Sequence, residues 1–94
     1  MAGLRIGDIE WDAGNVLHLE LNHGIRPEEA EDVLAGDPHV RRTKKGHYKA
    51  FGRTSAGRLL VIVFEMKPKQ LARPITGWDM DSAEAGYCRK MKGR

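Results

Sequence analysis

The chain has 94 residues, of which 40% are hydrophobic and 31% charged, and it contains one cysteine. This length fits one small domain, residues 1–94, and excludes a large multidomain enzyme. No apolar run approaches the roughly 20 residues that span a bilayer, and the N-terminal segment lacks the apolar core of a secretory signal. Cys88 has no partner for an internal disulfide. We therefore expect a cytoplasmic protein with no membrane partner.

The net charge of +3 conceals a strong asymmetry along the chain. Residues 1–38 carry nine carboxylates and two cations, whereas residues 39–73 carry ten cations and one carboxylate. Such a division predicts a surface of one sign that binds a polyanion. The alternative is that the two halves of the domain attract each other.

In chain order, residues 4–10 alternate weakly and predict a short strand. Asp12 is a suitable N-cap for a helix that begins at Ala13, and Gly24 can end that helix in the left-handed conformation. We expect this helix to bury one broad apolar stripe, consisting of Val16, Leu17, Leu19 and Leu21. A second helix is expected to begin at Pro27 and to end at Gly36.

The pattern then changes to strands, at residues 38–43, 47–54, 58–66 and 70–77. The third of these is almost continuously apolar, which predicts a central strand buried on both faces. Asp79 or Asp81 can cap a final helix, and we expect its basic tail, residues 89–94, to fray. We summarise this pattern as an α+β fold in the order β-α-α-β-β-β-α. It has an antiparallel meander of about four strands, two N-terminal helices and one C-terminal helix. With the helices on one face, the other face would be partly open to a ligand.

Several short segments occur in the order and spacing of a known family. They are Ile9-Glu10-Trp11-Asp12, His23-Gly24-Ile25, Pro27-Glu28-Glu29-Ala30, Gly52-Arg53-Thr54, Gly57-Arg58-Leu59-Leu60-Val61 and Arg73-Pro74-Ile75-Thr76. Over roughly residues 6–90 the chain resembles the BrnT toxins. That resemblance implies a RelE-like fold and cleavage of RNA without a metal or another cofactor. It also implies a type II toxin–antitoxin pair whose antitoxin is a BrnA-like ribbon-helix-helix protein. The chain departs from the family at Gly77-Trp78, where Ala-Arg is common.

Metal-free cleavage uses the 2′-hydroxyl of RNA as the nucleophile, so the protein must move protons and stabilise negative charge on the phosphate. Histidine titrates near neutral pH, which makes His23 and His47 the acid–base candidates, although His23 can instead cap the first helix. Glu65, the one carboxylate of the basic segment, is either a general base or a charge-balancing partner. Arg53 and Arg73 complete the catalytic set as phosphate ligands, or else pair with carboxylates at the margins of the sheet.

The remaining candidates are expected to bind RNA. They are Lys44, Lys45, Lys49, Arg58, Tyr48 and Trp78. We expect Arg58 to gather with Arg53 and Arg73 on one face of the sheet. Tyr48 and Phe51 point to opposite faces, so at most one of them can stack on a base. Trp78 either stacks on RNA or packs the last helix against the sheet.

We therefore expect a toxin that cuts RNA and inhibits translation, with mRNA, free or on the ribosome, as its target. The alternative is a non-catalytic protein of the same fold that binds antitoxin or nucleic acid without cleaving it. Direct binding to DNA is a third, weaker hypothesis.

Overall fold

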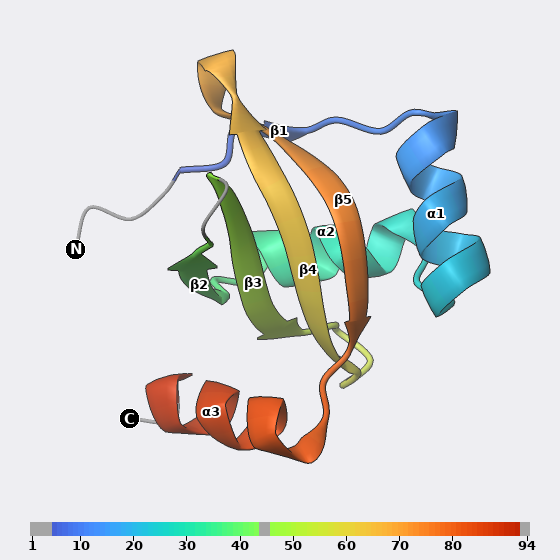
Figure 1. The fold of residues 1–94 in the computed structure, drawn as a ribbon. Helices are drawn as coiled ribbons and strands as arrows, with labels where there is room; N and C mark the ends of the chain where they lie inside the picture. Colours follow the sequence, from blue (N-terminus) through green and yellow to red (C-terminus); the bar gives the residue numbers. More distant parts are fainter. Residues whose placement is uncertain (1–4, 44–45, 93–94) are drawn as a thin grey trace.

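The computed structural model describes residues 5–43 and 46–92. A five-stranded sheet carries helices on both faces (Figure 1). Its strands are β1 (Asp8–Ile9), β2 (His39–Arg42), β3 (His47–Arg53), β4 (Leu59–Lys67) and β5 (Leu71–Asp79). The helices are α1 (Ala13–His23), α2 (Pro27–Ala35) and α3 (Ser82–Lys92), and a 3₁₀ turn, η1 (Pro68–Gln70), joins β4 to β5.

The sheet has the strand order β1-β5-β4-β3-β2. Strands β2 to β5 form the expected antiparallel meander, whereas β1 pairs in parallel with β5. The α+β class and the four-stranded meander are confirmed, and the summarised order β-α-α-β-β-β-α counts one strand too few, because all five expected strand segments form. The first strand is shorter than residues 4–10, of which residue 4 lies outside the described chain. Flanking N–H groups of Gly7 and Glu10 donate to carbonyls of Gln70 and Ala72, which holds this segment against β5.

Local capping signals set the bounds of α1 and α2. The carboxylate of Asp12 accepts from the N–H of Asn15, and Gly24 ends α1 at φ 62° and ψ 29°. Pro27 opens α2, where the missing N–H of proline costs nothing. These bounds agree with the sequence prediction.

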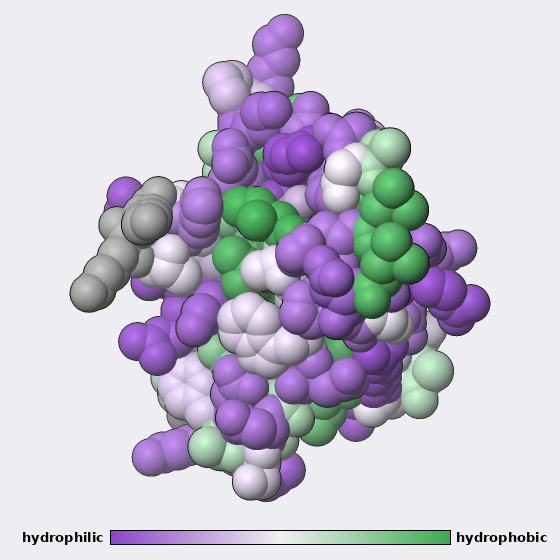
Figure 2. Space-filling view, turned by 45° about the vertical axis from the view of Figure 1, so that its right-hand side comes forward, coloured by the Kyte–Doolittle hydropathy of each residue, from purple (hydrophilic) through white to green (hydrophobic). Residues whose placement is uncertain are grey.

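The expected apolar stripe of α1 is wrong in part. Leu19 is buried, but Leu17 is 51% exposed and Leu21 is 79% exposed. Figure 2 shows the resulting apolar surface on the right of the view, over α1. Only one side of α1 faces β5, and the polar Asn15 occupies part of that side by donating to the carbonyl of Pro74.

The predicted central strand, β4, is buried on both faces. One face packs against α1 and α2 through a large cluster that includes Leu60, Ile62 and Phe64. On the other face, Val61 and Phe51 pack against Cys88 of α3. The expectation that all helices share one face is therefore wrong, because α3 crosses one end of the opposite face (Figure 1).

Helix α3 begins after Asp81, whose carboxylate accepts from the N–H of Glu84 at 2.8 Å. The helix continues through Lys92, and residues 93–94 lie outside the described chain. None of the helices within the described ranges is long and apolar enough to cross a bilayer.

Candidate nucleic-acid interface

The sheet face that α3 only partly covers carries a cross-strand row of four side chains, three of them polar, on which the site is built. In register, Arg41 of β2 opposes Lys49 of β3, Lys49 opposes Val63 of β4, and Val63 opposes Thr76 of β5. Directly opposed residues point to the same face of an antiparallel sheet. We call this part of the sheet, from the row Arg41–Lys49–Val63–Thr76 toward η1, the open face. Figure 2 shows an apolar area over the sheet that hydrophilic side chains surround.

The two cations of this row lie over aromatic rings. The Nζ atom of Lys49 is 5.5 Å from the centroid of the Trp78 ring, and Cζ of Arg41 is 5.6 Å from that of Tyr87. Neither cation makes an ion pair among the described residues, so their charge is available to an anion. Among the predicted RNA ligands that the structure describes, Lys49 is therefore the cation that lies on the open face.

A pair of histidines from α1 reaches the β5 end of the row. The Nε2 atoms of His18 and His23 lie 3.1 and 3.2 Å from the Thr76 hydroxyl oxygen. Their ring centroids are 5.5 Å apart. His23 was a predicted catalytic residue, whereas His18 and Thr76 were missed. Their only sequence signal is weak: His18 and Asn22 have the i, i+4 spacing that places side chains on one side of a helix.

A second predicted pair also meets on the open face. His47 and Glu65 are opposed in the β3–β4 register, and His47 Nε2 lies 3.8 Å from Glu65 Oε1. Their side chains are 36% and 40% exposed, so both groups remain open to solvent. Glu65 lies two residues beyond Val63, a separation of about 7 Å along the strand. The open face thus carries an imidazole–carboxylate pair on β3 and β4 and a histidine pair beside β5.

Arg73, predicted to bind phosphate, is committed to carboxylates instead. Its Nη1 donates to Asp12 at 2.7 Å and lies 3.4 Å from Glu10. The hydrogen bond from Arg73, together with the N–H of Asn15, lowers the pKa of Asp12 to about 2. Arg73 thereby holds the N-terminus of α1 against β5, and Lys67 adds a second ion pair to Glu10 at 2.9 Å.

Arg58 lies on the opposite face of the sheet from the open face. Its Nε donates to Asp79 at 2.7 Å, and its Nη1 donates to Glu29 at 3.0 Å and to the carbonyl of Gly24 at 2.9 Å. The bonds to Asp79 and Glu29 raise the pKa of Arg58, and the bond from Arg58 lowers the pKa of Asp79. The pKa of Glu29 is lowered mainly by the backbone N–H of Arg26, and further by Arg58. Arg58 therefore joins the ends of α1, α2 and β5, and it is not placed to bind RNA on the open face.

The expected gathering of three arginines on one face is thus wrong. Arg53 is exposed at the end of β3 that pairs with Leu59, whereas Arg73 pairs with Glu65. Six residues of β4 separate these positions, which corresponds to about 20 Å. Alternation of side chains sends Arg58 to the other face. The basic and acidic halves do attract each other, through Arg58, Lys67 and Arg73.

The aromatic candidates are used for packing. Tyr48 stacks on Phe64 with ring centroids 5.6 Å apart, on the face that α1 and α2 cover. Phe51 is buried on the α3 side. Trp78 packs against α3 and donates its indole N–H to Glu84, at 3.1 and 3.2 Å from the two carboxylate oxygens. The predicted Lys44 and Lys45 lie outside the described residues.

The departure at Gly77-Trp78 has a structural basis. A Cβ atom at position 77 would lie 2.8 Å from the carbonyl oxygen of Val61, so the backbone requires glycine there. The Trp78 ring lies between Lys49 and α3.

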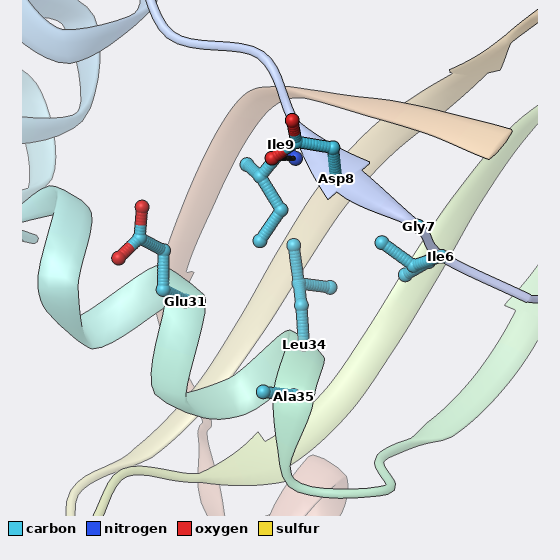
Figure 3. Close-up of a pocket in the computed structure, with 7 residues that line it drawn as sticks. All are labelled: Ile6, Gly7, Asp8, Ile9, Glu31, Leu34 and Ala35. Atoms are coloured by element: carbon cyan, nitrogen blue, oxygen red, sulfur yellow. Dashed lines mark hydrogen bonds between the residues drawn. The ribbon is translucent and has the colours of Figure 1, made fainter. Parts of the chain in front are cut away.

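A groove on the other side of the molecule, of about 320 Å³, lies between β1 and α2. It is lined by Ile6, Gly7, Asp8, Ile9, Glu31, Leu34 and Ala35 (Figure 3). The carboxylates of Asp8 and Glu31 repel phosphate, so this groove does not suit RNA. Within residues 5–43 and 46–92, no three His, Cys, Asp or Glu side chains gather as metal ligands.

No family model and no curated protein matches this chain. Among solved structures, its fold matches that of a ribonuclease toxin. That protein is BrnT of Brucella abortus, with a TM-score of 0.67 and 18% identity over 80% of this chain and 97% of the toxin chain. The likeness confirms the α+β fold that the sequence resemblance implied.

Proposed function

We propose that this protein is the toxin of a type II toxin–antitoxin pair, a metal-independent RNA endonuclease that inhibits translation. One observation carries the proposal: the open face combines unpaired cations with imidazoles on a sheet that has the fold of a ribonuclease toxin. Proton-transfer groups next to a cationic, half-buried surface are what cleavage through the 2′-hydroxyl requires.

The reaction assigns a role to each group of the open face. The 2′-oxygen bonds to phosphorus while the bond from phosphorus to the 5′-oxygen breaks, which leaves a 2′,3′-cyclic phosphate and a 5′-hydroxyl. The 2′ proton passes to the pair of His47 and Glu65, and His23 donates a proton to the leaving 5′-oxygen. Lys49 holds the negative charge of the phosphate.

The proposed partners follow from the same assignment. RNA, with mRNA as the target, free or on the ribosome, would lie across the open face in the cytoplasm. The resemblance to BrnT toxins supports a ribbon-helix-helix antitoxin of the BrnA kind as the protein that neutralises this chain.

The test is incubation of the purified chain with mRNA, with and without ribosomes, in the presence of EDTA. Cuts that end in 2′,3′-cyclic phosphate support the proposal. Intact RNA in both settings, with the protein shown to be folded by circular dichroism, contradicts it.

The second candidate function is binding without cleavage, and the arginines favour it. Carboxylates engage both Arg58 and Arg73, and Trp78 stands where the BrnT family often has arginine. Among the described arginines near the row, only Arg41 would then remain to stabilise negative charge in the transition state. Induction of the chain in a bacterial host separates the two candidates: arrest of growth supports the toxin, and unaffected growth supports the binding protein.

A further inference from the structure

A continuous chain of hydrogen bonds joins α1 to the open face. Asn22 Nδ2 lies 2.9 Å from His18 Nδ1, His18 Nε2 lies 3.1 Å from Thr76 Oγ1, and Thr76 Oγ1 lies 3.2 Å from His23 Nε2. Both imidazoles therefore meet one hydroxyl. Among the described residues, no hydrogen bond engages Nδ1 of His23.

The direction of each bond follows from the first donor. With the Asn22 amide nitrogen turned toward His18, this nitrogen donates, so Nδ1 of His18 accepts and the proton of His18 resides on Nε2. That Nε2–H donates to the Thr76 oxygen, and the Thr76 hydroxyl then donates to Nε2 of His23. A neutral His23 consequently carries its proton on Nδ1, the nitrogen that remains for a substrate oxygen.

The same chain also accommodates an additional proton on His23. The Nε2–H of the imidazolium donates to Thr76, whose hydroxyl turns toward Nε2 of His18. His18 then carries its proton on Nδ1, and rotation of the Asn22 amide presents an oxygen to it. No member loses a hydrogen bond in either state, so the His23 ring stays fixed. The imidazolium is the form that gives its Nδ1 proton to the leaving oxygen, which leaves the proton on Nε2, and proton exchange with water then restores the Nδ1 tautomer of the resting chain.

We infer that His18 is a positioning residue for His23. Through the Thr76 hydroxyl, it orients the His23 imidazole and keeps the proton of the neutral ring on Nδ1. The inference rests on the proposed function, in which His23 protonates the leaving 5′-oxygen. His18 itself contacts no substrate in this arrangement, because Thr76 and Asn22 occupy both of its ring nitrogens.

The first test removes the linking hydroxyl at nearly constant volume. Thr76→Val should lower kcat for RNA cleavage by about 10- to 100-fold, a part of what general acid catalysis contributes, with KM within about twofold. Thr76→Ser keeps the hydroxyl and should stay within about threefold of the original kcat. His18→Ala should match Thr76→Val. Leu21→Ser, on the same helix and 79% exposed, serves as the control for a change in α1.

The second test observes the imidazoles directly by ¹⁵N nuclear magnetic resonance of the full chain at pH 8. The neutral forms should carry their protons on Nε2 of His18 and on Nδ1 of His23. Thr76→Val should shift both sets of ring signals, while the signals of His39 and His47 stay in place.

The two tests separate failure of this inference from failure of the proposed function. Cleavage that persists unchanged in His18→Ala and Thr76→Val overturns the inference and leaves the ribonuclease proposal standing. If the original chain cuts no RNA, the ribonuclease proposal fails, and the ring signals alone decide whether His18 sets the tautomer of His23. If the ring signals of His18 and His23 are the same in Thr76→Val as in the original chain, the inference is overturned in either case.

Discussion

Replacement of Arg58 tests most sharply whether this cation stabilises the fold or binds RNA. Its guanidinium makes hydrogen bonds to Asp79, to Glu29 and to the carbonyl of Gly24 that ends α1. The Asp79 side chain is 59% exposed, so its ion pair contributes only about 0.5 kcal/mol. The Glu29 side chain is 18% exposed, and its bond and the bond to Gly24 contribute about 1 kcal/mol each.

Arg58→Ala should therefore lower the free energy of unfolding by about 2–3 kcal/mol, which corresponds to about 10–20 °C in Tm for a chain of this size. Arg53→Ala is the matched control, because Arg53 is exposed and makes no ion pair within the described residues. Its effect should stay within about 0.5 kcal/mol. Urea unfolding followed by circular dichroism at pH 7 measures both changes.

The same variants are then titrated with a fluorescent single-stranded RNA at a temperature where both are folded. Arg58→Ala should bind within about twofold of the original affinity, because Arg58 lies on the opposite face from Lys49. The reasoning is refuted if Arg58→Ala keeps its stability but loses RNA binding.

Three further predictions follow from the geometry. Asp12 has a folded pKa lowered to about 2 by Arg73, so its stabilisation is complete above the unfolded pKa of about 4 and is lost as pH falls toward 2. Asp12→Asn should flatten the fall in urea midpoint over that window, and an unchanged slope would contradict the ion pair. Gly77→Ala should lower the free energy of unfolding by about 1–3 kcal/mol through its clash with the β4 backbone, whereas Gly86→Ala, which meets no atom within 4 Å in α3, should raise it by up to about 1 kcal/mol. Equal effects of the two changes in thermal unfolding would contradict this. Lys49→Ala should weaken RNA binding and reduce the slope of log K against log salt by about 1, and an unchanged slope would remove Lys49 from the interface.

Local signals in the sequence were sufficient to predict most elements. Asp12 and Gly24 act within one helical turn, so the bounds of α1 could be predicted without knowledge of its neighbours. The continuous apolar run of β4 likewise determines its central place, because only burial on both faces suits it.

Features that depend on distant contacts could not be predicted in this way. The exposure of Leu17 and Leu21 depends on how far α1 overlaps β5, and periodicity carries no information about that. The position of α3 depends on the packing of Cys88 against Val61 and Phe51, which are remote in sequence.

The candidate site shows the same division. The facing of His47 and Glu65 follows from strand register. Pairing of Arg73 with a carboxylate was one of the two alternatives expected, but neither spacing nor charge indicated that Asp12 would be its partner. The link between His18 and Thr76 spans 58 positions of the sequence, and only the packing of α1 on the edge of β5 creates it.

The central claim is that RNA is cut on the open face with a proton from His23. The most direct measurement is the rate at which 2′,3′-cyclic phosphate ends form from one defined RNA in EDTA, with the original chain and with His23→Gln purified in parallel. The account predicts that these ends form with the original chain and that their rate falls at least about 100-fold in His23→Gln. Equal rates in the two preparations would contradict it.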